Sequence, residues 1–198
     1  SSAASDVYKR QDDDTKAELK SIENNEKEIE ERFYRELEFG TAGMRGIIGA
    51  GTNRINIYNV RRASQGVAKY VLSNGEDAAK AGVLIGYDTR NFSRTFAEET
   101  AKVLTCAGVK TYLFPIVHSV PEVSFGIREL GCSAGVMITA SHNPKEYNGY
   151  KVYGPDGGQL PPDAADVVVA AIDSYDIFDD VKSVSYTHLR AHETRSNL

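Results

Sequence analysis

The chain has 198 residues, of which 41% are hydrophobic and 26% are charged, and this composition and length suit one globular domain with a real core. The formal net charge of −5 argues against a nucleic-acid or anionic-membrane partner, because both bind basic surfaces. No apolar run approaches the roughly 20 residues of a membrane helix, and no signal peptide opens the sequence. We therefore expect a cytoplasmic protein in which Cys106 and Cys132 are buried, reduced thiols.

The two ends of the chain lack the hydrophobic periodicity of the residues between them. Residues 1–11 and 184–198 resemble translated adaptor or cloning sequence, so we expect the native domain to span residues 12–183. His188 and His192 have the i, i+4 spacing of two metal ligands on one helix face. They have no third ligand nearby in the sequence, which argues against a metal site there.

In chain order, the first predicted element is a charged surface helix over residues 15–38, whose apolar residues roughly follow a helical stripe. Glycine-rich residues 40–46 then indicate a loop, which precedes a strand at residues 47–48. After a turn, residues 55–57 can return as a paired strand. Residues 59–73 are predicted to be a helix that stops at an Asn-Gly pair.

Three short apolar runs, at residues 83–87, 110–114 and 135–139, are predicted to be strands. None of them alternates, which suits strands buried on both faces of a sheet. Helices are expected between them, over about residues 93–108 and 121–130. This order predicts a three-layer α/β fold, in which helices flank a mixed, largely parallel sheet, and it places ligands at the carboxyl ends of the strands.

Residues 139–151, after the third run, carry the densest polar chemistry of the chain. Ser141 leaves the strand at the ligand-binding edge, and the turn signal Asn148-Gly149 is expected to fold Lys151 back toward it. From the residues alone, the segment is either a plain polar loop or a reactive one. Because Ser141 is next to His142, a serine hydrolase with Ser141 as nucleophile and His142 as base is a competing interpretation. The absence of a Gly-x-Ser-x-Gly motif from the sequence argues against it.

Arg45 is a second candidate, because arginine binds phosphate through its fork and Gly43 beside it lets the backbone approach a phosphate closely. A plain turn is the alternative for this segment. The glycine spacing is not that of a dinucleotide-binding fingerprint, so NAD binding is disfavoured. Asp88 and Arg90 also follow a strand, and for them we favour a structural role, a local ion pair or cap that braces the helix at Ser93.

Two motifs resemble those of the α-D-phosphohexomutases, the phosphoglucomutase and phosphomannomutase family. TASHNP at residues 139–144 resembles the phosphoserine loop of that family. The longer string TASHNPKEYNGYKVYG, with GQLPP after it, and the earlier EFGTAGMRGIIGAGTNRIN are most similar to the phosphoglucomutase and phosphopentomutase branch. The resemblance covers about residues 15–180.

The resemblance implies the first domain of a four-domain sugar-phosphate mutase, an intramolecular phosphotransferase that interconverts glucose 1-phosphate and glucose 6-phosphate. Ser141 would carry the phosphoryl group and exchange it with sugar phosphates through a bisphosphate intermediate. Lys151 would act as general acid and base, and Arg45 would face the phosphoserine. His142 and Asn143 would donate hydrogen bonds to the phosphate.

The resemblance also implies Mg²⁺, bound through a phosphoserine oxygen of Ser141 and an Asp-x-Asp-x-Asp loop in a second domain, with a glucose bisphosphate as activator. No such loop occurs in residues 12–183, so we expect an N-terminal fragment that is inactive alone. The branch favours glucose phosphates over pentose or mannose phosphates as partners. The alternative is a non-catalytic sugar-phosphate-binding or regulatory domain.

Overall fold

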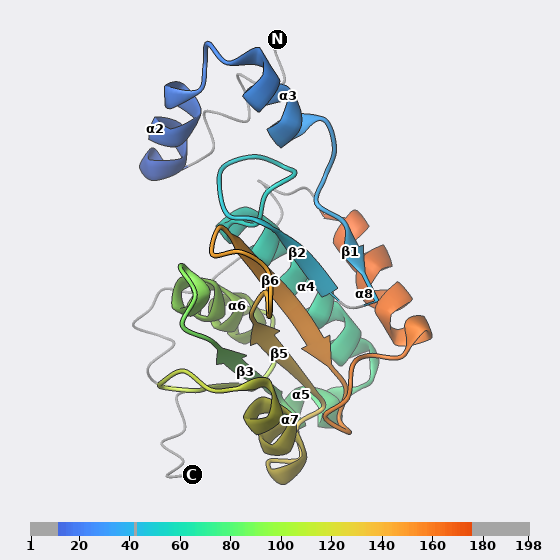
Figure 1. Cartoon of the computed structure of the whole chain (residues 1–198). Coiled ribbons are helices and arrows are strands. Elements are labelled where there is room, and N and C mark those ends of the chain that lie inside the picture. The colour runs from blue at the N-terminus through green and yellow to red at the C-terminus, as the bar shows by residue number, and fades with distance from the viewer. Residues whose placement is uncertain (1–11, 42, 176–198) are drawn as a thin grey trace.

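One six-stranded sheet organises the residues that the computed structural model describes, 12–41 and 43–175 (Figure 1). The strands lie in the order β1-β2-β6-β5-β3-β4. Their bounds are β1 Phe39–Gly40, β2 Gly43–Ile47, β3 Val83–Tyr87, β4 Thr111–Leu113, β5 Ala134–Ile138 and β6 Tyr147–Tyr153. The helices are α2 Asp13–Ser21, α3 Glu26–Phe33, α4 Ile57–Ser73, α5 Glu76–Ala81, α6 Ser93–Cys106, α7 Val120–Glu129 and α8 Pro162–Asp173.

Strand direction divides the sheet into two parts. Strand β3 lies between β4 and β5 and is parallel to both. Strand β6 is antiparallel to β5 and to β2, and β2 is antiparallel to β1. The predicted three-layer α/β fold with a mixed sheet is confirmed. The sheet is not largely parallel, because only two of its five strand pairings, those of β3 with β4 and with β5, are parallel.

Helices cover both faces of the sheet. Helix α4 packs against α6 and α8 over the larger hydrophobic core, and α7 packs against β3 and β5 over a smaller one. Successive residues of β3 alternate between the cores, with Val83 and Ile85 in the larger and Leu84 in the smaller. In β5, Val136 and Met137 divide in the same way. Burial on both faces explains why these strands show continuous apolar runs in the sequence.

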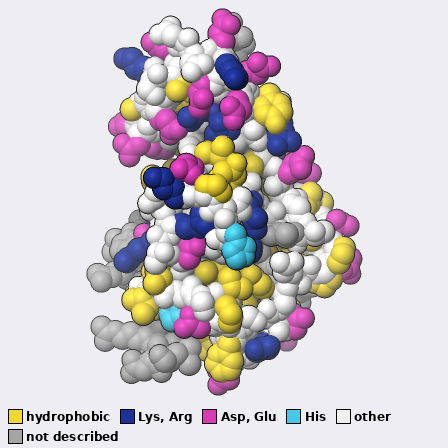
Figure 2. Space-filling model, viewed as in Figure 1, with side chains coloured by type: hydrophobic (Ala, Val, Ile, Leu, Met, Phe, Trp, Pro, Cys, Tyr) yellow, Lys and Arg dark blue, Asp and Glu magenta, His cyan; other side chains and the backbone are white. Residues whose placement is uncertain are grey.

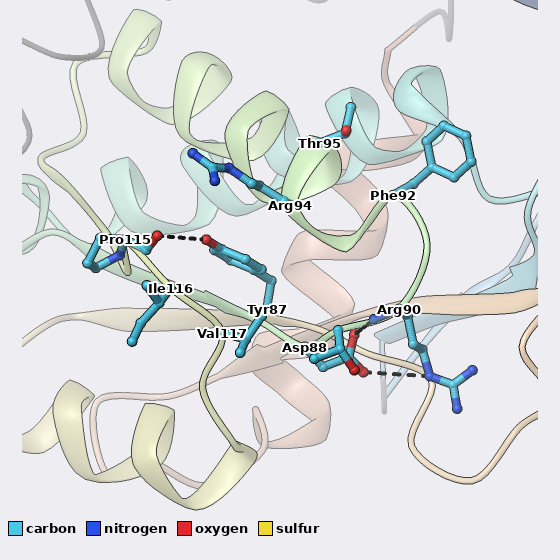
Figure 3. A pocket seen from close by; sticks show the side chains of 10 residues that line it. Tyr87, Asp88, Arg90, Phe92, Arg94, Thr95, Pro115, Ile116 and Val117 are labelled. Atoms are coloured by element: carbon cyan, nitrogen blue, oxygen red, sulfur yellow. Dashed lines mark hydrogen bonds and ion pairs between the residues drawn. The ribbon is translucent and has the colours of Figure 1, made fainter.

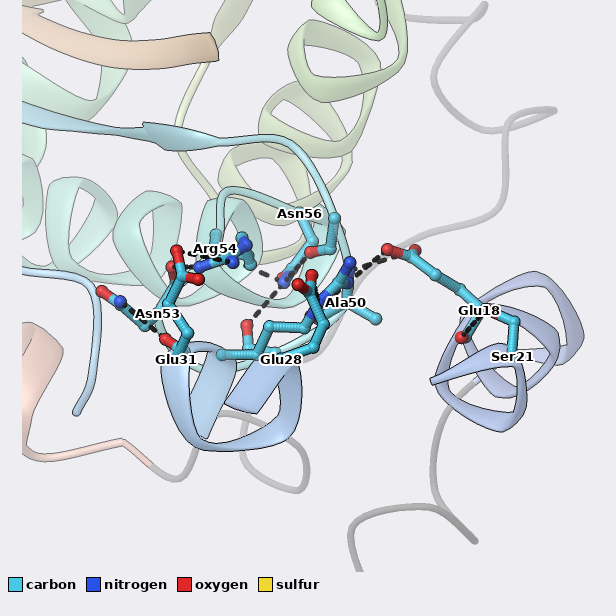
Figure 4. Close-up of polar contacts among 11 residues, drawn as sticks. Glu18, Ser21, Glu28, Glu31, Ala50, Asn53, Arg54 and Asn56 are labelled. Carbon is cyan, nitrogen blue, oxygen red and sulfur yellow. Dashed lines mark hydrogen bonds and ion pairs between the residues drawn. The ribbon is translucent and has the colours of Figure 1, made fainter. Parts of the chain in front are cut away.

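The segment predicted as one helix over residues 15–38 forms two helices, α2 and α3. Asn25 separates them, because its side chain accepts a hydrogen bond from a backbone N–H in the first turn of α3 and caps that helix. Arg32 of α3 forms an ion pair with Glu18 of α2 and donates to the carbonyl of Ala50 at 3.0 Å. These polar contacts, part of the group drawn in Figure 4, fasten both helices to the loop after β2.

Two expectations for the next segment are wrong. Residues 40–46 are not a loop before a strand, because strand β2 itself begins within them. Residues 55–57 do not return as a strand, since Ile55 makes only an isolated bridge with Ile48 and α4 begins immediately afterwards. Asn56 accounts for the helix start, because its side chain accepts hydrogen bonds from two backbone N–H groups of the first turn of α4.

The predicted helices between the parallel strands are present as α6 and α7, and a short helix, α5, was not anticipated. Ser93 does not cap α6, because Phe92 occupies that position with a left-handed φ of 63°. None of the described helices is long and apolar enough to cross a membrane.

The two cysteines differ in exposure. Both are free thiols, but Cys106 is exposed at the end of α6, so the expectation that it is buried is wrong. Cys132 is buried in the smaller core. Burial raises the pKa of the Cys132 thiol to about 11, which keeps it protonated at neutral pH.

Gly40 and Gly43 pair across β1 and β2 and offer a matched test of how closely β2 approaches β6. Gly43 has φ +91°, and a Cβ there would lie 2.0 Å from the carbonyl oxygen of Tyr150, whereas a Cβ on Gly40 would meet nothing within 4 Å. We expect Gly43→Ala to lower the free energy of unfolding by at least about 2 kcal/mol, through backbone strain and overpacking. Gly40→Ala should change it by less than about 0.5 kcal/mol. Urea denaturation measures both, and equal losses would contradict the close approach.

Candidate active site

Ser141 stands where strand β5 emerges from the core. Thr139 and Ala140 before it are buried, whereas Ser141 is exposed. Ser141 has a left-handed φ of 53°, and its backbone N–H donates to Thr139 Oγ1 at 3.0 Å. A non-glycine residue in this conformation is uncommon, and such residues concentrate at functional sites.

Lys151 reaches the Ser141 hydroxyl from the neighbouring strand. Its Nζ donates to Ser141 Oγ at 2.8 Å. The expected approach is present, but its expected cause is wrong, because Asn148-Gly149 lies inside β6 rather than in a turn. The turn occupies residues 141–146, and antiparallel pairing of β6 with β5 brings Lys151 beside the strand that leads to Ser141.

The surroundings of Lys151 disfavour its charged form. Partial burial, and next the positive charge of Arg45, lower the pKa of Lys151 below its usual value. The amine therefore loses its proton more readily than that of an ordinary lysine. A group with this property, in contact with a hydroxyl, can exchange a proton with it.

Arg45 lies on β2, directly across from Gly149 of β6. Its Nη1 donates to Asn143 Oδ1 at 2.9 Å, so Arg45 lies at the same edge of the sheet as the loop that holds Ser141, as expected. Gly43, two residues earlier, lies against the backbone of β6 at Tyr150 and Lys151. Its support of a phosphate stays a prediction.

His142 follows Ser141 in the exposed loop, and no hydrogen bond of its side chain occurs among the described residues. A catalytic or phosphate-binding role for it stays a prediction. Figure 2 shows lysine and arginine side chains in the middle of the viewed face with a histidine next to them, whereas acidic side chains are frequent above them. Basic side chains beside an exposed loop suit an anionic ligand.

Arg90 makes contacts that the sequence did not indicate. The expected brace is confirmed, since Asp88 Oδ1 accepts from the Arg90 backbone N–H at 2.9 Å and from Ser93 Oγ at 2.7 Å. The Arg90 guanidinium also donates to four backbone carbonyls between Ser141 and Tyr147. No sequence signal could have revealed these acceptors, because every residue carries a carbonyl.

A cavity of about 460 Å³ lies beside this arginine (Figure 3). Residues that follow β3 and β4 line it, among them Asp88, Phe92 and Val117. It therefore opens at the carboxyl ends of the parallel strands, where ligands of such sheets bind.

The described residues could contribute to the expected magnesium site only through a phosphate on Ser141, and that role stays a prediction. They contain no group of three or more His, Cys, Asp or Glu side chains that could hold a metal ion. Lys151, which contacts the Ser141 hydroxyl, and Arg45, which contacts Asn143 of the same loop, are basic and suit an anion such as that phosphate. His188 and His192 lie outside the described residues.

Comparisons with known proteins agree on one family. A family model described as phosphoglucomutase/phosphomannomutase, alpha/beta/alpha domain I, matches residues 36–177. A phosphoglucomutase of Staphylococcus haemolyticus is 48% identical over 136 residues, which are 69% of this chain and 24% of that protein. A Schizosaccharomyces pombe protein named a probable phosphoribomutase is 44% identical over 165 residues, 82% of this chain and 28% of that protein. The chain thus spans about a quarter of the length of these relatives.

Solved structures share the fold. A Thermus thermophilus protein described as a candidate phosphomannomutase aligns with a TM-score of 0.66 and 28% identity, over 77% of this chain and 32% of that one. A Paramecium parafusin, a phosphoglucomutase in its open form, aligns with a TM-score of 0.59 over 79% of this chain and 28% of that one, and at 22% identity it supports the fold alone. The chain belongs to the phosphoglucomutase/phosphomannomutase family and contains its α/β/α domain I.

Proposed function

We propose that this chain supplies the phosphoserine domain of a sugar-phosphate mutase that interconverts glucose 1-phosphate and glucose 6-phosphate through a bisphosphate. The observation that carries the proposal is the 2.8 Å contact between Lys151 Nζ and the exposed Ser141 Oγ at the end of a buried strand. Membership of the mutase family supplies the reaction class.

In this proposal Ser141 carries the transferable phosphoryl group. The sugar hydroxyl attacks the phosphorus, a new P–O bond forms to the sugar, and the bond from phosphorus to Ser141 Oγ breaks. Lys151, as an ammonium, gives a proton to the leaving Ser141 Oγ, and the proton of the sugar hydroxyl replaces it. In the reverse transfer, Ser141 Oγ attacks a phosphorus of the bisphosphate, and the bond from that phosphorus to the sugar oxygen breaks. Lys151 gives a proton to the leaving sugar oxygen, and the proton of the Ser141 hydroxyl replaces it.

Basic and amide groups stabilise the phosphorylated state. A phosphoserine adds about −1.5 to −2 charges at neutral pH. Arg45, held against Asn143, places a permanent positive charge at the loop. His142 is a further donor in this proposal because of its place beside Ser141. The added negative charge would raise the pKa of Lys151, opposite to its direction in the unphosphorylated chain, and so favour the ammonium needed for transfer.

Glucose phosphates are the proposed substrates because the Staphylococcus relatives are named phosphoglucomutases. Pentose phosphates rank second, because the S. pombe relative is named for ribose. We propose that the remaining magnesium ligands lie outside the described residues. We also propose a glucose bisphosphate as the activator that supplies the phosphate. We also propose a cytoplasmic location, and no turnover by the isolated chain, which spans about a quarter of its relatives.

Ser141→Ala tests the phosphoryl carrier in a hybrid in which residues 36–177 replace the matching part of the S. haemolyticus phosphoglucomutase. We expect the unsubstituted hybrid to turn over glucose 1-phosphate and the alanine variant to fall to background, because no other atom at the position can hold the group. After treatment with glucose 1,6-bisphosphate, mass spectrometry should find the adduct on the peptide containing Ser141.

The control for that hybrid is Ser174→Ala, a serine at the end of α8 whose hydroxyl caps its own helix. It should retain activity. A stable adduct on another residue, or full turnover by Ser141→Ala, would remove the basis of the mutase proposal. Sugar-phosphate binding without any adduct would favour the non-catalytic alternative.

Lys151→Ala should separate phosphate storage from phosphate transfer. We expect the variant to hold phosphate on Ser141 but to transfer it about 10²–10⁴-fold more slowly, the range typical of a lost general acid or base. Single-turnover transfer from the phosphorylated hybrid to glucose 1-phosphate measures this rate. A variant that transfers at the original rate would exclude Lys151 as the proton carrier.

A further inference from the structure

The Arg90 side chain is largely buried beneath the loop that carries Ser141, with 16% of its surface exposed. Its Nη2 donates at 2.7 Å to the carbonyl of Ser141 and at 2.7 Å to that of Asn143. Its Nη1 donates at 2.9 Å to the carbonyl of Pro144 and at 3.1 Å to that of Tyr147. The planar guanidinium of Arg90 therefore binds backbone carbonyls at both ends of the loop.

Other polar groups hold Arg90 in place. Asp88 Oδ2 lies 3.6 Å from Arg90 Nε, and Figure 3 shows the two side chains side by side. Asp88 Oδ1 also accepts from Ser93 Oγ, and Ser93 Oγ in turn accepts from Nδ2 of the fully buried Asn148 at 2.9 Å. Asn148 belongs to β6, the strand of Lys151. The network thus joins the loop of Ser141 to the strand of Lys151.

The contact with the Ser141 carbonyl bears directly on the hydroxyl. Ser141 has a left-handed φ, and a bond to its own carbonyl restrains the adjoining ψ angle. With both angles held, the direction of the Cα–Cβ bond is fixed, and so is the range of positions open to Oγ. The 2.8 Å distance from Ser141 Oγ to Lys151 Nζ depends on that direction.

We propose that Arg90 is a positioning residue that holds the Ser141 hydroxyl against Lys151 and thereby sets the rate of phosphoryl transfer. The proposal rests on the proposed function and adds to it a residue that touches neither the phosphate nor the sugar. Its action needs the planar guanidinium. A lysine at the same place is a point charge with three donors, and it lacks the fork that spans separate carbonyls.

Arg90→Lys tests this role, and Arg128→Lys is the matched control. Arg128 is exposed near the end of α7 and does not line the cavity beside Arg90. In the hybrid enzyme we expect Arg90→Lys to lower kcat about 10²-fold with KM changed less than about threefold, as misplacement of a reacting group by about 1 Å does. Arg128→Lys should keep both values. Added methylguanidinium should restore part of the kcat of Arg90→Ala.

A second measurement on the intact 198-residue chain needs no turnover. The lysines are methylated reductively with ¹³C, and the Lys151 signal is identified by its loss in Lys151→Ala. The pKa of Lys151 should rise toward the ordinary lysine value in Arg90→Lys, because the loop no longer shields the amine, and stay unchanged in Arg128→Lys. Thermal unfolding of each variant checks that the fold persists.

The outcomes separate this proposal from the mutase proposal. If the unsubstituted hybrid takes up no phosphate, the mutase proposal fails, and a rise of the Lys151 pKa in Arg90→Lys still supports the positioning role. An unchanged Lys151 pKa in folded Arg90→Lys, or an unchanged kcat, overturns the positioning role. Loss of activity in Arg90→Ala that methylguanidinium does not restore also overturns it.

Discussion

Strand β6 lies between β5 and β2, and its antiparallel pairing with both neighbours decides which side chains meet at the site. The parallel strands deliver Ser141 to the carboxyl edge of the sheet and Arg90 to its carbonyl, but the described partner of its hydroxyl comes from β6. The long Lys151 side chain reaches back from β6, and Arg45 reaches the loop from β2. A change in the register of β6 by one residue would turn Lys151 to the opposite face of the sheet, and the Ser141 hydroxyl would lose its contact with Lys151.

Buried polar groups hold that register. Tyr150 of β6 is fully buried, and its hydroxyl lies 2.9 Å from Ser64 Oγ of α4. Burial raises the pKa of Tyr150, so the hydroxyl stays neutral and can share a hydrogen bond in the core. The neighbouring Asn148 bonds to the carbonyl of Asn91 and to Ser93 Oγ. A shifted strand would leave these groups buried without partners, at a cost of about 1–3 kcal/mol for each.

Basic side chains gather at the loop of Ser141. Three basic side chains, Arg45, Arg90 and Lys151, contact the loop or its serine, and two of them are bound to the loop itself. Arginine stays charged under all ordinary conditions, whereas Lys151 can change its charge. The permanent charge of Arg45 lowers the pKa of Lys151, and a phosphate on Ser141 would raise it. In the proposed mutase, the protonation of Lys151 would therefore be coupled to the phosphorylation of Ser141.

The sequence by itself determined the α/β class, the three parallel strands and the place of Ser141 after the last of them, because two-sided burial leaves a continuous apolar run and loops follow strand ends. It also identified Lys151 and Arg45 through resemblance. Only the tertiary structure decided that residues 43–47 form a strand and that Asn148-Gly149 lies within another, because the pairing between β2 and β6 overrides the local turn preference of glycine and asparagine. It alone gave Arg90 its contacts with the loop, since backbone carbonyls are common to all residues and only the folded chain selects which of them a guanidinium can reach.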